Sequence, residues 1–81
     1  MTHAEVLSAV TTVAQDIFQE DDLVLSDQTT AKDVEAWDSL AHIQFILAVE
    51  RKFGVRFDAG EVTGIQNVGA LVALVLKKLQ R

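Results

Sequence analysis

The chain of 81 residues contains no cysteine and no proline. Without cysteine it has no disulfide framework, no thiolate zinc site and no thiol chemistry of its own. Long apolar runs are also missing, since the longest extends only from Ala70 to Leu76. A helix that crosses a bilayer needs about 20 such residues, so we expect a core helix there. The N-terminal residues lack the basic region of a signal peptide, and we expect a cytoplasmic protein without membrane insertion.

Basic residues are scarce in the first part of the chain. Residues 1–50 carry ten acidic residues and one base, Lys32, whereas residues 51–81 carry two acidic and six basic residues. The formal net charge of −5 is therefore distributed as −9 in the first part and +4 in the second. The acidic part argues against nucleic-acid binding, which requires clustered Lys and Arg, and it favours a partner with a basic surface.

The apolar pattern predicts one all-α domain over residues 1–81, and we expect the protein to be a monomer. The hydrophobic fraction of 49% suffices for one compact core. Apolar residues recur at spacings of three and four, which is typical of amphipathic helices. Three longer helices and one short helix are expected over residues 3–19, 39–53, 68–80 and 59–63. Residues 20–37 form a long loop between the first two helices, from which Val24 and Leu25 should reach into the core.

Capping residues at the expected helix ends agree with these boundaries. Thr2 and Glu5 match a capping box at the first helix, and Asp38 is a strong N-cap residue for the second. Gly54 can adopt the left-handed conformation that ends a helix, and Asn67 can cap the last helix. The acids at 20–22 oppose the helix dipole and should end the first helix.

Ser39 lies at the expected start of the second helix, directly after Asp38. Free backbone N–H groups and the helix dipole favour negative charge there, so a phosphate ester on Ser39 would be well accommodated. Asp38 could cap the helix or help to hold Mg²⁺ during a phosphoryl transfer. No other metal site is expected, because the acids of the loop lack the spacing of a calcium-binding loop.

Two other interpretations of Asp38-Ser39 remain open on these residues. The pair could simply begin a helix, as Ser and Asp often do. The domain could then be an acidic helical protein-interaction module with no prosthetic group. A hydrolase with Ser39 and His42 would also need an oriented base, an oxyanion hole and a pocket. No glycine elbow surrounds Ser39, and a chain this short leaves little room for the rest, so catalysis is the least favoured.

Asp38-Ser39-Leu40 before an amphipathic helix resembles the attachment motif of acyl carrier proteins. The resemblance extends over nearly the whole chain, because the first helix, the long acidic loop, the short third helix and the apolar last helix are all similar to that family. Glu50 and Phe53-Gly54-Val55 behind the motif add to the similarity.

The resemblance implies an antiparallel bundle of three longer helices and one short helix. It also implies that a separate, magnesium-dependent phosphopantetheinyl transferase attaches 4′-phosphopantetheine from coenzyme A to Ser39. The thiol of this arm would carry acyl groups as thioesters, which fits a chain without cysteine. The protein would be a carrier and not itself an enzyme, with acyl-loading and acyl-transfer enzymes as partners. Candidate residues of an acyl cleft are Leu40, Ile43, Phe45, Ile46, Val49 and Ile65.

The second helix departs from the family pattern. Carriers of bacterial fatty-acid synthesis usually have a strongly acidic second helix that docks on basic patches of partner enzymes. Here the expected acids are replaced by Ala41, Gln44, Arg51 and Lys52. This favours a discrete carrier of a specialised polyketide, modified-lipid or peptide-type pathway over a housekeeping fatty-acid carrier, and the missing Gly-Gly before the serine argues against a peptidyl carrier. Candidate docking residues are Glu35, Trp37, Leu40, Ala41, Gln44 and Glu50.

Overall fold

The computed structural model describes residues 1–80, which fold into helices joined by loops, with no strand among them. The elements are α1 (His3–Phe18), the 3-10 helix η1 (Ala31–Asp33), α2 (Ser39–Phe53), α3 (Ala59–Thr63) and α4 (Val68–Gln80). The all-α prediction is confirmed, and the first helix ends one residue earlier than expected. The short helix η1 lies in the loop, where the sequence has no helical period.

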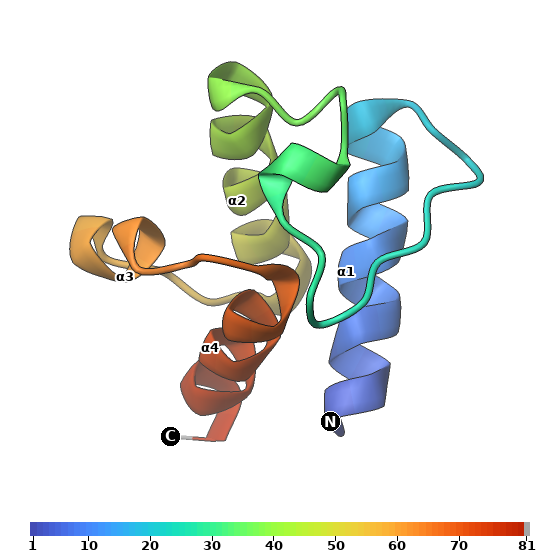
Figure 1. The fold of residues 1–81 in the computed structure, drawn as a ribbon. Coiled ribbons are helices and arrows are strands. Elements are labelled where there is room, and N and C mark those ends of the chain that lie inside the picture. Colours follow the sequence, from blue (N-terminus) through green and yellow to red (C-terminus); the bar gives the residue numbers. More distant parts are fainter. Residues whose placement is uncertain (81) are drawn as a thin grey trace.

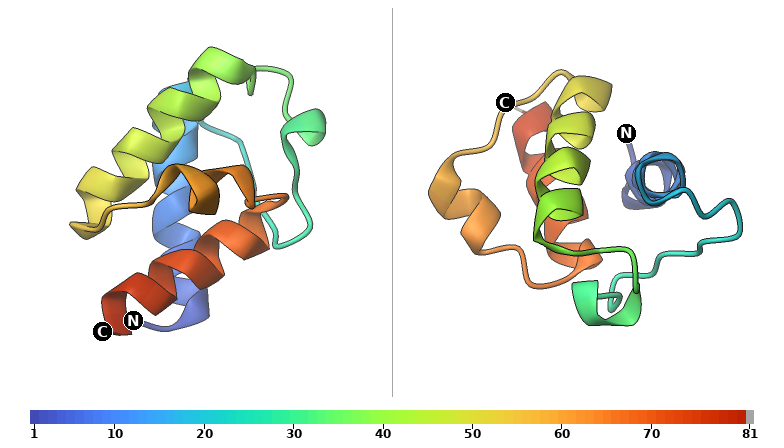
Figure 2. Two further views of the ribbon diagram at one scale, coloured as in Figure 1. Left: turned by 90° about the vertical axis from the view of Figure 1, so that its left-hand side faces the viewer. Right: turned by 90° about the horizontal axis from the view of Figure 1, so that it is seen from above.

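The three longer helices form an antiparallel bundle (Figure 1). Helix α1 runs in the opposite direction to α2 and α4 and packs against both of them. The short helix α3 lies on the far side of α2 and α4 from α1, as the view from above shows (Figure 2). None of the described helices is long and apolar enough to cross a membrane.

One continuous apolar core lies between the helices and extends under the long loop. Its buried members are Val6, Val10, Ala14, Phe18, Leu25, Val34, Trp37, Phe45, Ile46, Val49, Val68, Leu71, Val72 and Val75. Phe18, Trp37 and Phe45 form an aromatic cluster, with ring centroids 5.3 to 5.5 Å apart. This cluster fixes the end of the long loop against α1 and α2, and therefore fixes the segment that enters α2.

Helix α1 ends at a C-terminal turn that the sequence analysis does not predict. Gln19 adopts the left-handed conformation (φ 55°, ψ 43°), and its N–H donates to the carbonyl of Gln15. The side chain of Gln15 in turn donates to the carbonyl of Leu23 over 2.9 Å. A specific C-terminal turn thus ends the helix, in addition to the acids that follow it. Leu25 is buried as expected, but the prediction for Val24 is wrong, because that side chain is 82% exposed.

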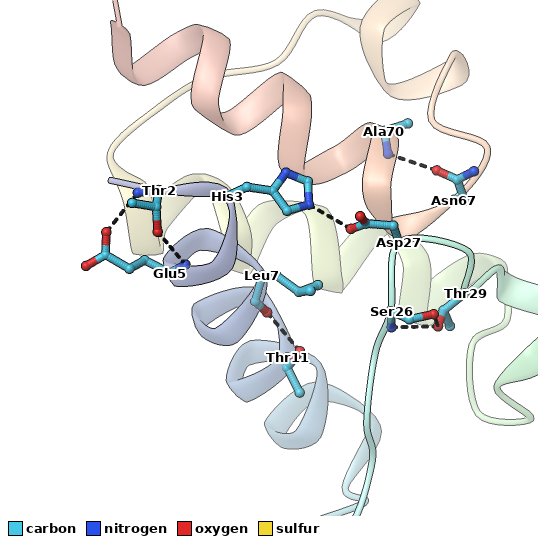
Figure 3. Close-up of polar contacts among 10 residues, drawn as sticks. All are labelled: Thr2, His3, Glu5, Leu7, Thr11, Ser26, Asp27, Thr29, Asn67 and Ala70. Carbon is cyan, nitrogen blue, oxygen red and sulfur yellow. Dashed lines mark hydrogen bonds and ion pairs between the residues drawn. The ribbon is translucent and has the colours of Figure 1, made fainter.

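The long loop is joined to the start of α4 by hydrogen bonds. The carbonyls of Asp27 and Thr29 each accept from a backbone N–H at the start of α4, from Gly69 and Val68 respectively, both over 2.9 Å. Asn67 caps the same helix as expected, since its side-chain oxygen accepts from the N–H of Ala70 (Figure 3). The loop therefore supplies acceptors that the N–H groups of a helix start require.

Two further contacts hold the loop in this position. The imidazole Nε2 of His3 lies 2.8 Å from Oδ1 of Asp27, which connects the start of α1 to the loop (Figure 3). Gly69 leaves room for the close approach of the backbone, because a Cβ there would lie 2.9 Å from Cβ of Asp27. The start of α1, the middle of the loop and the start of α4 are thus held together at one place.

Candidate functional site

The N-terminus of α2 is set by the segment that precedes it. Val34 and Trp37 are buried, and they anchor the chain on either side of the exposed residue Glu35. Asp38 then takes an extended conformation (φ −94°, ψ −174°), and its Oδ1 accepts from the N–H of Ala41 over 2.8 Å. Asp38 is therefore the N-cap residue, as predicted, and Ser39 becomes the first residue of the helix.

Ser39 is exposed and lies at a place that favours negative charge. The N–H groups of the first helical turn point outward there, and the positive end of the helix dipole adds to their field. The serine borders a shallow hollow of about 440 Å³, lined also by Ala31, Trp37, Asp38 and His42. An anionic group bonded to the hydroxyl would have both electrostatic support and space.

His42 is bound to Trp37 beside this hollow. The indole Nε1–H of Trp37 donates to Nδ1 of His42 over 3.0 Å, and the two rings are almost parallel, with centroids 5.9 Å apart. In the neutral imidazole the proton therefore resides on Nε2. With Nδ1 accepting from the indole and Nε2 protonated, the neutral ring has no free acceptor for the hydroxyl proton of Ser39, which the base of a hydrolase must take.

A second hollow, which we name the α2–α3 groove, lies between these two helices and has a volume of about 390 Å³. It is lined by His42, Ile43, Ile46, Leu47, Glu50, Phe57, Ala59, Val62 and Thr63. The sequence predicts Ile43 and Ile46 as cleft residues, and both are there. Phe57 and Val62 are missed, because only the placement of α3 brings them opposite α2.

The other predicted cleft residues lie elsewhere. Phe45 and Val49 are fully buried, with 0% exposure, and belong to the apolar core. Leu40 is 66% exposed on the outer side of α2 and does not line the groove. Ile65 packs partly against the core and borders a small hollow of about 50 Å³ together with Trp37 and His42.

The predicted docking residues are also separated by the fold. Trp37 is only 8% exposed and belongs to the aromatic cluster of the core. Glu50 is half-buried, and its Oε2 accepts from the N–H of Phe57 over 2.7 Å, so it stabilises the loop before α3. Glu35, Leu40 and Gln44 are exposed near Ser39, whereas Ala41 is half-buried against the core.

Helix α3 is held in place by polar contacts at its ends. Its N-cap Asp58 forms a capping box with Glu61, and Nζ of Lys78 lies 2.8 Å from Oε1 of Glu61. The hydrogen bond from Lys78, together with that from the backbone N–H of Asp58, lowers the pKa of the Glu61 carboxyl. The same bond raises the pKa of Lys78. The outer wall of the α2–α3 groove is thus connected to the end of α4.

Comparison with known proteins identifies the family. Residues 8–75, which include Ser39, match the family model described as "phosphopantetheine attachment site". The chain is 41% identical to the holo acyl carrier protein of Geobacter metallireducens, whose structure was solved by solution NMR. That similarity covers 94% of this chain and 87% of the other, with a TM-score of 0.89. No curated protein matched the sequence.

The family match and the solved structure agree with the geometry around Ser39. The matched region spans the described helices from within α1 to within α4, so it covers the fold and not the short motif alone. The chain belongs to the phosphopantetheine attachment-site family and is a carrier protein of the acyl carrier type.

Proposed function

We propose that Ser39 is the residue that carries 4′-phosphopantetheine, and that the protein delivers acyl groups bound as thioesters to the end of this arm. The observation that carries the proposal is the exposed Ser39 hydroxyl at the first residue of α2, inside the region that matches the attachment-site family. The hollow next to Ser39 and the α2–α3 groove share His42 as a wall residue, so the two spaces are neighbours.

The residues around Ser39 fit such a group. Its phosphate would lie at the start of α2, where backbone N–H groups and the dipole favour an anion. One oxygen of the Asp38 carboxylate accepts from the N–H of Ala41 and completes the helix cap. When bound, the group supplies the thiol that a chain without cysteine lacks.

The α2–α3 groove is the proposed place for the apolar part of an acyl group. Ile43, Ile46, Phe57 and Val62 give it apolar walls. Each methylene that these side chains remove from water contributes about 0.8 kcal/mol. A groove that is open to solvent would hold the chain reversibly, which suits a carrier that must release its load to enzymes.

The proposed partners are a separate phosphopantetheinyl transferase, which modifies Ser39, and the enzymes that load and transfer acyl groups in the cytoplasm. The Asp38 carboxylate lies beside Ser39, where it would help to hold Mg²⁺ while the transferase modifies the serine. The pathway that we propose is a specialised branch of fatty-acid, polyketide or related lipid biosynthesis. The support for it is α2, in which Ala41, Gln44 and Arg51 replace the acids usual in housekeeping carriers.

The attachment of the prosthetic group is tested by intact-mass measurement. The purified protein is incubated with coenzyme A, Mg²⁺ and a phosphopantetheinyl transferase, and the mass of one phosphopantetheine should be added. Ser39→Ala should abolish this increase, whereas Ser8→Ala, at an exposed position on α1, should leave it unchanged. An unmodified wild-type protein, or a modified Ser39→Ala variant, would contradict the proposal.

A further inference from the structure

The outer side of α2 carries a continuous strip of exposed side chains, two of which, Ile43 and Leu47, also border the α2–α3 groove. Leu40, Ile43 and Leu47 are 66%, 57% and 49% exposed. They are separated by three and four residues, and Arg51, also exposed, follows after four more. This spacing places all four on one face of the helix. We name Leu40, Ile43, Leu47 and Arg51 the α2 strip.

A basic hollow lies at the end of the α2 strip that is distant from Ser39. It has a volume of about 520 Å³ and is lined by Leu47, Glu50, Arg51, Gly54, Val55, Arg56 and Phe57. Arg51 and Arg56 are exposed, and neither forms an ion pair within residues 1–80. Glu50 is the acid in this hollow, and one of its oxygens is bound to the N–H of Phe57. The hollow therefore has an excess of positive charge and an apolar wall.

The end of α4 adds to the basic character of this region. Arg56 shares a smaller hollow with Lys78, so the loop after α2 lies beside the C-terminal part of α4 (Figure 2). Lys78 itself is paired with Glu61. Lys77 lies in the same last turn of α4 and is exposed, but it lines neither hollow, so it is a cation outside the α2 strip.

The opposite end of α2 has the reverse charge. Asp33, Glu35 and Asp38 are exposed in the segment that leads to Ser39. Arg51 follows Ser39 by twelve residues, so the acidic and basic ends are separated by about 18 Å at a helical rise of 1.5 Å per residue. The α2 strip is therefore apolar in its middle, acidic at the attachment site and basic at the distant end.

Helix stability alone accounts for only part of this arrangement. A cation in the last turn of α2, such as Arg51, complements the helix dipole. Arg56, however, lies outside the helix. The dipole also gives no reason for three large apolar side chains to be exposed in a row on the same face. Contiguous exposed apolar residues with a polar border are typical of an interaction surface.

We infer that the α2 strip binds a partner enzyme whose surface has an apolar recess for Ile43 and Leu47 and an acidic side chain that enters the hollow between Arg51 and Arg56. The inference rests on the proposed carrier function. It specifies the partner's chemistry: an acid about 18 Å from the entrance that receives the arm of Ser39. The opposite charges at the two ends favour one orientation of docking, because the reversed orientation brings like charges together.

The experiment uses two synthetic helical peptides as probes. Both have leucines on one face; the first has glutamates at one end, and the second has lysines in their place. Amide chemical shifts of the isotope-labelled protein, with and without the prosthetic group, are followed as each peptide is added. The glutamate peptide should bind and should shift resonances of the α2 strip and of residues 54–57. The lysine peptide should bind up to about fivefold more weakly, as expected for one lost exposed charge pair.

Variants distinguish binding at the α2 strip from a general effect of the protein's charge. The double variant Arg51→Glu, Arg56→Glu should lower the affinity for the glutamate peptide about tenfold. It should bind the lysine peptide more tightly than the glutamate peptide. Lys77→Glu makes the same kind of charge change outside the α2 strip and should alter binding less than about twofold. Ile43→Ser should weaken the binding of both peptides, because the leucines of both would contact the apolar side chains of the α2 strip. Far-UV circular dichroism verifies that each variant is folded.

Several outcomes would overturn the inference. These are equal affinity for both peptides, no binding of the glutamate peptide, shifts confined to other regions, or an effect of Lys77→Glu as large as that of the arginine variants. The outcome is independent of the mass measurement on Ser39. A protein that is modified at Ser39 but fails the peptide test keeps the carrier function and loses only this docking surface.

Discussion

The hydrogen bond between Trp37 and His42 leads to a prediction about stability. The variant His42→Phe keeps an aromatic ring next to the indole but removes the nitrogen that accepts its N–H. Trp37 is 8% exposed, so its Nε1–H would be left largely without a partner. A buried donor without an acceptor costs about 1–3 kcal/mol. We expect the free energy of unfolding to fall by that amount.

Urea denaturation measures this change. Trp37 is the only tryptophan of the chain, so its fluorescence reports the unfolding of this region directly. Far-UV circular dichroism should give the same midpoint if the domain unfolds in one step. A domain of this size has a total stability of only about 5–10 kcal/mol, so the expected loss is easily detected.

The matched control is the other histidine. His3→Phe removes a contact with Asp27 in which both side chains are nearly half exposed, at 46% and 47%. Such an exposed pair contributes less than about 1 kcal/mol. The reasoning about the indole would be refuted if His42→Phe were as stable as the wild type, or if His3→Phe lost more stability than His42→Phe.

Three further changes have expected outcomes. Gly69→Ala places a Cβ 2.9 Å from Cβ of Asp27 and should cost about 1–3 kcal/mol in urea denaturation. Asp38→Ala removes the cap of α2 and should cost about 0.5–2 kcal/mol in the same measurement. Glu61→Gln should remove a pH-dependent contribution to stability. Because pairing with Lys78 lowers the pKa of Glu61, that contribution is fully present above the ordinary glutamate pKa of 4.5 and is lost as pH falls through the lowered value.

The glycine and the glutamate variants each have a control. Gly60→Ala is the control for Gly69→Ala, because a Cβ at Gly60 meets nothing within 4 Å. The Gly60→Ala variant should not be destabilised. For Glu61, the difference in stability between wild type and variant is plotted against pH. At high pH the same contribution should disappear as pH rises through the pKa of Lys78, which the pairing raises above the ordinary lysine value of 10.5. If the difference in stability between wild type and Glu61→Gln stayed constant from acid to alkaline pH, the pairing of Glu61 with Lys78 would be contradicted.

The helices could be predicted from the sequence because their signals are local. The spacing of apolar residues predicts α2 and α4 with the bounds that the structure has. Asp38, Gly54 and Asn67 act within one helical turn, so their capping roles follow from their neighbours in the chain. The location of Ser39 at a helix start was predictable for the same reason.

Loop burial and groove walls could not be predicted, because they depend on contacts between distant segments. Val24 and Leu25 are adjacent apolar residues, yet the path of the loop exposes one and buries the other. Trp37 lies beside an exposed serine, and only the positions of Phe18 and Phe45 decide that it turns inward. The helical period of α2 likewise does not reveal which apolar face is covered by α1 and which faces α3.

The hydrogen bonds between the long loop and α4 have a consequence for the order in which the loop is fixed during folding. Asp27 and Thr29 find their partners at Gly69 and Val68, about forty residues further along the chain. Contacts between such distant residues form late in folding, because a large loop must be closed first. The middle of the long loop therefore acquires these two hydrogen bonds only when α4 has docked. The start of α2 depends instead on the aromatic cluster of α1 and α2, so the two ends of the long loop are fixed by different pairs of helices.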